Sequence, residues 1–331
     1  MIRVLFKKTR FHFFSNHRSR FVFGTILGVL IIGAAIFQTN LLPVNALECP
    51  TKGKNITFNT NCELEAAQYE FQGTLTISVG ATVTVRNRST SEGTVISADE
   101  IIINGTLTAN GTGANIGIGP GSGKGQVSAS HGGLGVISAV TVPESVPPAG
   151  LTNTLGVVYG SIKTPAMPGS GGSIGNGGGA IMLISRQGGI TINGTVSADG
   201  VGDGSGGSIW INSHGKLNGN GWISANGGSG GLQIPGGGGG RIAIYSSADD
   251  SWLIRNNKVK ALGGSSVWGI GGSGTIFVKS AGEPNGKLII YNESDETSVT
   301  PIKSKDLFDS LIVTGRNKVL IEGGGTLGLT G

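Results

Sequence analysis

The chain has 331 residues, of which 62 are Gly, 13% are charged and 6% are aromatic. A collagen-like fibre is excluded, because no strict G-x-y period runs through the sequence and Pro totals only 11. Simple disorder is excluded as well, since 37% of the residues are apolar and Val, Ile and Thr recur between the glycines.

The formal charge of +5 comes from the N-terminal segment. Residues 1–46 hold six of the 24 basic residues and none of the 19 acidic ones. The rest of the chain therefore carries 18 basic against 19 acidic residues, a net charge of −1. A basic face for nucleic acid is not expected.

The first 46 residues predict an export segment. Basic residues precede the uncharged run 21–37, and Val44-Asn45-Ala46 forms a signal-peptidase site with cleavage after Ala46. An uncleaved anchor is the alternative, because residues 21–42 are long enough to cross roughly 30 Å of hydrocarbon as an apolar helix. Both interpretations place the remainder outside the cytoplasm, in the extracellular space or at the cell surface.

Cys49 and Cys62 are the only cysteines. In an oxidising compartment we expect them to pair, which would stabilise the fold by about 3 kcal/mol in the chain-entropy model. Two unpaired thiols are the alternative. The disulfide would cross-link an N-terminal cap at residues 47–72, which precedes a repeat domain at residues 73–331.

A repeat of strand-like units is clearest between residues 178 and 280. Four segments open alike, with their first Ile at positions 181, 209, 242 and 276: GGAIML, GGSIWI, GGRIAI and SGTIFV. The first three units continue into a second apolar alternation that ends at Ala198, Ala225 and Ala261, and residues 101–109 are an earlier relative. Spacing is nearly constant inside a unit and variable between units, which indicates fixed strands joined by variable loops.

Short alternating runs such as 73–79 and 81–85 have the period of β-strands, and Asn-Gly pairs mark turns between them. Strands this short are best stabilised by stacking into one continuous core. We therefore predict an all-β fold, a parallel β-helix with Gly-rich loops. Segments 111–125, 169–179 and 227–240 are expected to project from one side. A β-sandwich is the alternative, because alternation does not distinguish parallel from antiparallel pairing.

A set of glycine-rich motifs carries a family resemblance, with coverage of roughly residues 73–280. The motifs are His131-Gly132-Gly133, Tyr159-Gly160-Ser161, Pro165, Pro168 to Gly172, and Gly177 to Ile181 before Ile190 to Ala198. This combination resembles glycine-rich, exported β-helical surface proteins and, more distantly, the passenger regions of filamentous-haemagglutinin-type adhesins. The resemblance implies a surface-structural or adhesive role, supplies no catalytic residues, and implies that the chain is short or truncated beside longer members.

Candidate catalytic residues are few. His131 and His214 both adjoin glycine, and neither belongs to a recognisable triad with a nucleophile and a carboxylate. Asp199 and Asp203 are the best close pair of acids, followed by Asp249-Asp250, and each pair could serve as catalytic acids. Calcium binding is a second possibility for Asp199 and Asp203. Turn geometry explains them equally well. No cofactor and no resident metal is predicted.

Four tryptophans recur about once per unit, and an exposed row of them could stack on sugars. They are Trp210, Trp222, Trp252 and Trp268. Packing in the core is the alternative.

We therefore expect an exported, noncatalytic surface-structural or adhesive solenoid that binds extracellular or cell-envelope glycans or proteins. The alternative is a carbohydrate-active β-helix enzyme, a polysaccharide lyase or hydrolase. Membrane contact is expected only through residues 21–42 if they remain uncleaved. At the other end, 311–313 and 318–321 start another strand pair without an evident cap. We expect either a missing continuation or an exposed final coil that self-associates.

Overall fold

The computed structural model describes residues 47–87, 92–123, 127–136, 155–232, 234–248, 256–293, 298–302 and 307–321. They belong to one compact unit, Leu47–Gly331. The predicted export segment with Ala46, the pair Asp249-Asp250, and Trp252 lie outside the described residues. The described ranges contain strands and no helix, and so no helix that could cross a membrane is found in them.

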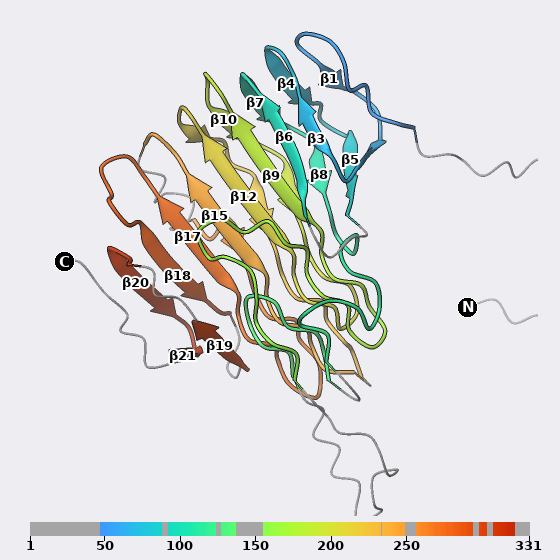
Figure 1. The fold of residues 1–331 in the computed structure, drawn as a ribbon, viewed down its shortest axis with the longest axis vertical. Coiled ribbons are helices and arrows are strands. Elements are labelled where there is room, and N and C mark those ends of the chain that lie inside the picture. The colour runs from blue at the N-terminus through green and yellow to red at the C-terminus, as the bar shows by residue number, and fades with distance from the viewer. Residues whose placement is uncertain are drawn as a thin grey trace, which may run out of the picture. The chain divides into compact units, whose positions relative to one another are not determined.

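Three sheets surround the core, and each of the first five turns of the chain, from β1 to β15, adds one strand to each sheet (Figure 1). The first sheet holds β1 (Thr57–Phe58), β4 (Thr74–Ile77), β7 (Glu100–Ile103), β10 (Ile190–Ile192) and β13 (Leu217–Asn218). The second holds β2 (Cys62–Glu65), β5 (Thr82–Arg86), β8 (Thr106–Thr108), β11 (Thr195–Ser197), β14 (Trp222–Ser224) and β16 (Val259–Lys260).

The third sheet is the widest. It holds β3 (Gln68–Glu70), β6 (Thr94–Ala98), β9 (Ala180–Ser185), β12 (Ser208–Ser213), β15 (Arg241–Tyr245), β17 (Thr275–Lys279), β18 (Lys287–Tyr291) and β20 (Ser310–Thr314). A separate pair joins β19 (Val299–Ile302) to β21 (Lys318–Ile321).

Nearly all strand pairs are parallel, which confirms the β-helix and excludes the sandwich. The exception is β17 with β18, which are antiparallel because the chain turns back at residues 280–286 instead of starting another coil. Segments 311–313 and 318–321 are strands as predicted, but each pairs with a different neighbour, β20 with β18 and β21 with β19.

The repeat in the sequence is the register of the third sheet. Ile209 on β12 lies between Ile181 and Ile242, and Ile242 pairs in turn with Ile276. All four side chains are buried, with at most 2% of their surface exposed. The first Ile of each unit therefore adds one more branched side chain to the same internal stack, in which successive coils are about 4.8 Å apart.

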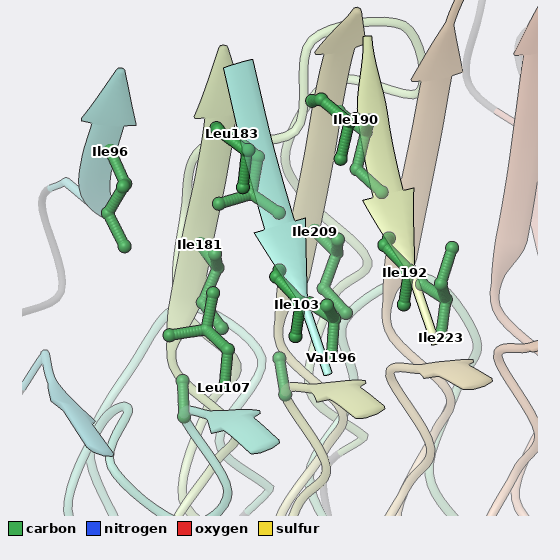
Figure 2. Close-up of a cluster of buried hydrophobic side chains, with 14 of the residues drawn as sticks. Ile96, Ile103, Leu107, Ile181, Leu183, Ile190, Ile192, Val196, Ile209 and Ile223 are labelled. Carbon is green, nitrogen blue, oxygen red and sulfur yellow. The ribbon is translucent and has the colours of Figure 1, made fainter. Parts of the chain in front are cut away.

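A second stack runs through the second sheet. Leu107, Val196, Ile223 and Val259 pair in succession, and the alanines at 109, 198, 225 and 261 that follow them are buried as well. Figure 2 shows side chains from all three sheets meeting in this core, among them Ile192, Val196 and Ile209. One continuous core thus joins the coils, as expected for strands too short to be stable alone.

The glycine-rich segments are largely packed against one another. This corrects the prediction that they project as loops from one side of the solenoid. Residues 169–172, 177–179 and 235–240 are buried, whereas parts such as Ser173 and Ile174 are exposed. In Figure 1 these connections gather below the strands. Gly238 donates to the carbonyl of Ala129 and accepts from the amide of Gly206, so one glycine run contacts several others. A Cβ at Gly238 would lie 2.1 Å from the carbonyl oxygen of Gly133, which only glycine avoids.

A smaller apolar cluster covers the outer face of the third sheet. It contains Ile162 and Phe308 from the connections, packed on Ala243, Phe277 and Leu288 of the sheet. The third sheet is therefore buried on both faces over this region, which explains the continuous apolar runs of β15, β17 and β18.

Cys49 and Cys62 form the predicted disulfide, with an S–S distance of 2.05 Å. Cys62 begins β2, which pairs with β5, so the bridge fixes residues 47–49 to the first coil of the solenoid. The disulfide indicates an oxidising environment.

Candidate functional site

An open groove of about 330 Å³, lined mostly by polar residues, lies where three neighbouring strands of the third sheet end. Its lining comes from the residues that finish β12, β15 and β17 and from the turns that follow: Asn212, Ser213, His214, Tyr245, Ser246, Ser247, Lys279, Ser280, Ala281, Gly282 and Glu283. The carboxyl ends of parallel strands meet at one edge of a sheet, so the repeat itself brings these side chains together.

One row of the groove is set by strand register. Asn212 pairs with Tyr245, and Tyr245 pairs with Lys279. An amide, a phenol and an ammonium side chain therefore follow one another on neighbouring strands whose backbones are about 4.8 Å apart. Asn212 is exposed, and Tyr245 and Lys279 are half-buried.

The Tyr245 ring is held in place by its neighbours. Its hydroxyl donates to the carbonyl of Lys163 at 2.9 Å, and its ring lies 5.5 Å from Phe277 and 6.4 Å from Trp210. The aromatic part of the groove is therefore fixed before any ligand binds, which lowers the entropic cost of binding.

Glu283 is the one carboxylate among the described residues that line the groove. Its Oε2 accepts the amide of Ser280 at 3.0 Å, and its Oε1 lies 2.5 Å from Lys287 Nζ. The groove thus offers hydroxyl, amide, imidazole and ammonium groups around an aromatic ring, with an acid that is tied to its own turn. This is the chemistry of a polar ligand site.

Asp199 belongs to a ladder of side chains that cap successive coils. Asn110 Oδ1 accepts the amide of Asp199 at 2.7 Å, Asp199 Oδ1 accepts the amide of Asn226 at 2.6 Å, and Asn226 Oδ1 accepts the amide of Leu262 at 2.8 Å. Each member directly follows one of the stacked alanines. Burial raises the pKa of Asp199, while the bonds from Asn226 and Ser224 act in the opposite direction.

Asp203 is buried and holds a different segment. Its Oδ2 accepts the amide and hydroxyl of Ser173, both at 2.6 Å, and its Oδ1 accepts the amides of Ile174 and Gly175 at 2.9 and 3.0 Å. Asp199 and Asp203 therefore bind separate partners, and both act as structural acceptors. No group of three or more His, Cys, Asp or Glu side chains arranged for a metal ion occurs among the described residues.

The described tryptophans, Trp210, Trp222 and Trp268, do not form the predicted row. Trp210 lies half-buried on the outer face of the third sheet, and Trp222 is 44% exposed on the second sheet. Trp268 lies in a glycine-rich turn, where its Nε1 donates to the carbonyl of Leu232 at 3.0 Å. Their positions within the units differ, so their recurrence in the sequence does not place them on a common face.

His131 is fully buried, so its imidazole ring does not face solvent. Its ring stacks on Tyr159 at 4.4 Å, and its Nδ1 lies 2.7 Å from the carbonyl oxygen of Gly206. Burial, together with the neighbouring Arg241 guanidinium, lowers the pKa of His131 to about 3. Burial also lowers the pKa of Arg241 to about 10. By contrast, His214 is exposed and lines the groove.

Sequence reasoning missed Asn212 and Lys279, although a signal existed. The aligned units read GGSIWIN, GGRIAIY and SGTIFVK, and their last letters are the row that lines the groove. No family model matches the chain, and neither the curated proteins nor the solved structures contain a match.

Proposed function

We propose that this protein is an exported, noncatalytic adhesive solenoid that binds a glycan in the groove at the ends of β12, β15 and β17. The observation that carries the proposal is the row Asn212, Tyr245 and Lys279, in which amide, aromatic and cationic groups lie side by side on a rigid sheet. Sugars present both hydroxyl groups and apolar ring faces, which fit a polar groove beside an aromatic side chain.

The volume of the groove fits this use. At about 330 Å³ it lies near the lower limit of small-ligand sites, which span roughly 300–1,000 Å³. It therefore suits a short saccharide end. Export is supported by the disulfide and by the apolar segment at residues 21–37.

A noncatalytic role is supported by the acids. Hydrolysis or elimination of a glycan uses paired carboxylates, or a base beside a cation, directed at the substrate. In the described part of the groove Glu283 contacts Ser280 and Lys287, and Asp199 and Asp203 hold backbone amides elsewhere.

The test is a glycan array probed with residues 47–331, which form a unit of their own. We expect a hit whose affinity falls about thirty-fold in Asn212→Ala/Lys279→Ala, because two hydrogen bonds of roughly 1 kcal/mol each are lost. Asn218→Ala is the matched control, since Asn218 is an exposed asparagine on the first sheet.

The same glycan is then assayed for reducing ends. Unchanged reducing ends support adhesion, whereas time-dependent release would establish the enzyme and overturn the proposal. Equal binding by the wild type and the double variant would remove the groove as the site.

A further inference from the structure

A second exposed surface lies on the outer face of the second sheet and is independent of the groove. Trp222 is 44% exposed there, although large aromatic side chains are usually covered. Lys258 Nζ lies 4.1 Å and Lys260 Nζ 5.4 Å from the centre of the Trp222 ring. We call Trp222, Lys258 and Lys260 the cationic platform.

The turn before β16 places these lysines. Asn257 has a φ of 54°, in the left-handed region, and its Nδ2 donates to Tyr291 Oη at 2.9 Å and to Glu293 Oε1 at 3.0 Å. Lys260 Nζ lies 2.6 Å from the same Glu293 oxygen. A hydrogen-bonded network from two segments therefore holds Lys260 and the turn that carries Lys258.

Only one of the two lysines has an ion-pair partner among the described residues. Glu293 pairs with Lys260, whereas Lys258 forms no ion pair within the described ranges. An ammonium group over an exposed indole is thus left to attract an anion, and the indole supplies an adjoining apolar surface.

A row of hydroxyl groups continues the platform across the sheet. Trp222 pairs with Thr195, Thr195 with Thr106, and Thr106 with Thr82. All three threonines are half-buried, and their hydroxyls have no hydrogen-bond partner in the described part of the chain. The row crosses the strands at about 4.8 Å per step, so an extended polymer laid along it would meet one hydroxyl at each coil.

We propose that the cationic platform binds a linear polysaccharide that carries carboxylate groups. One sugar ring packs against the exposed part of Trp222, its carboxylate meets Lys258, and the chain continues over Thr195 and Thr106. Charge complementarity selects this ligand over a neutral polysaccharide, because Lys258 has no ion-pair partner among the described residues and Trp222 is 44% exposed.

The experiment measures binding of polygalacturonate to residues 47–331 by isothermal titration calorimetry, with dextran as the neutral polymer. We expect binding to polygalacturonate that weakens as salt is added, and at least about ten-fold weaker binding to dextran. Trp222→Ala is expected to lose about ten-fold in affinity, and Trp222→Phe, which keeps an aromatic face, to retain most of it. Lys258→Gln should weaken binding and flatten its salt dependence.

The groove variant Asn212→Ala/Lys279→Ala is the matched control and should bind polygalacturonate like the wild type. Failure of the groove proposal and failure of this one are therefore distinguishable. Equal binding by Trp222→Ala, Lys258→Gln and the wild type would overturn the proposal, as would equal affinity for dextran. Thermal unfolding of each variant shows whether its fold is intact, and Lys258→Gln tests the charge even where Trp222→Ala is unstable.

Discussion

Asp199 Oδ1 accepts the backbone amide of Asn226, one coil further along the chain, at 2.6 Å. Asn110 and Asn226 do the same for the coils on either side, so an aspartate stands in a ladder whose other two side chains are amides. The negative charge is not needed for this bond, and burial disfavours it.

Asp199→Asn is therefore expected to match or exceed the wild type in free energy of unfolding at pH 7, whereas Asp199→Ala should lose about 1 kcal/mol. The pKa of Asp199 is raised in the fold, so the folded state binds the proton more tightly and stability falls as pH rises through the interval above the unfolded value of 3.8. Asp199→Asn should abolish this fall. Urea unfolding at several pH values measures it, and a loss in Asp199→Asn as large as that in Asp199→Ala would exclude the ladder role.

Protonation of His131 opposes folding. Its pKa is about 3 in the fold, against 6.5 as its ordinary value, so between these values the unfolded chain binds a proton that the folded chain does not. Stability contributed by the neutral imidazole is present above pH 6.5 and declines as pH falls toward 3, by up to about 1.4 kcal/mol per pH unit.

His131→Asn should remove that slope from urea unfolding measured between pH 4 and pH 6.5, at some cost in stability at pH 7. His214→Asn is the control, because His214 is exposed in the groove and should leave the slope unchanged. An identical slope in the wild type and His131→Asn would show that other groups govern the acid response.

The sequence predicted the strands of the solenoid better than the glycine segments that join them. Register was readable because Ile181, Ile209, Ile242 and Ile276 hold the same place in their units, and a shift of one residue would turn each side chain away from the core. The glycine runs have no side chains to reveal a buried face. The backbone hydrogen bonds that join Gly238 to Ala129 and Gly206 span long sequence separations and leave no pattern in the sequence.

The candidate site could not be predicted from the sequence for a related reason. Asn212, Tyr245 and Lys279 share one place in the repeat but belong to three residue types, so similarity between units does not mark them. Asp203 was visible as an acid, but its contacts with residues 173–175 depend on how two glycine-rich connections pack.

Close packing of the glycine runs gives a sharp stability test. Gly238→Ala would place a Cβ 2.1 Å from the carbonyl oxygen of Gly133, so the neighbouring run must move. Gly188→Ala is the matched control, since its nearest contact would be the Cβ of Glu100 at 3.2 Å. We expect Gly238→Ala to lose at least about 2 kcal/mol more than Gly188→Ala in urea unfolding. Equal losses would mean that the runs are loosely packed.

The disulfide should contribute measurably. Replacing both Cys49 and Cys62 by Ser removes a cross-link that spans a separation of 13 residues, and the chain-entropy model gives a loss of about 3 kcal/mol. The measurement is urea unfolding of the variant, with the wild type under reducing and oxidising conditions for comparison. If reduction leaves the stability unchanged, backbone hydrogen bonds with β2 are sufficient to hold residues 47–49 in place.

The most direct test of the adhesive function is to recover the glycan that the protein retains and determine its mass. Residues 47–331 are incubated with the best array ligand, the complex is isolated, and the bound saccharide is released and compared with the input by mass spectrometry. We predict an intact saccharide that is retained by the wild type and lost from Asn212→Ala/Lys279→Ala. A shortened or unsaturated saccharide, or equal retention by both proteins, would contradict the account.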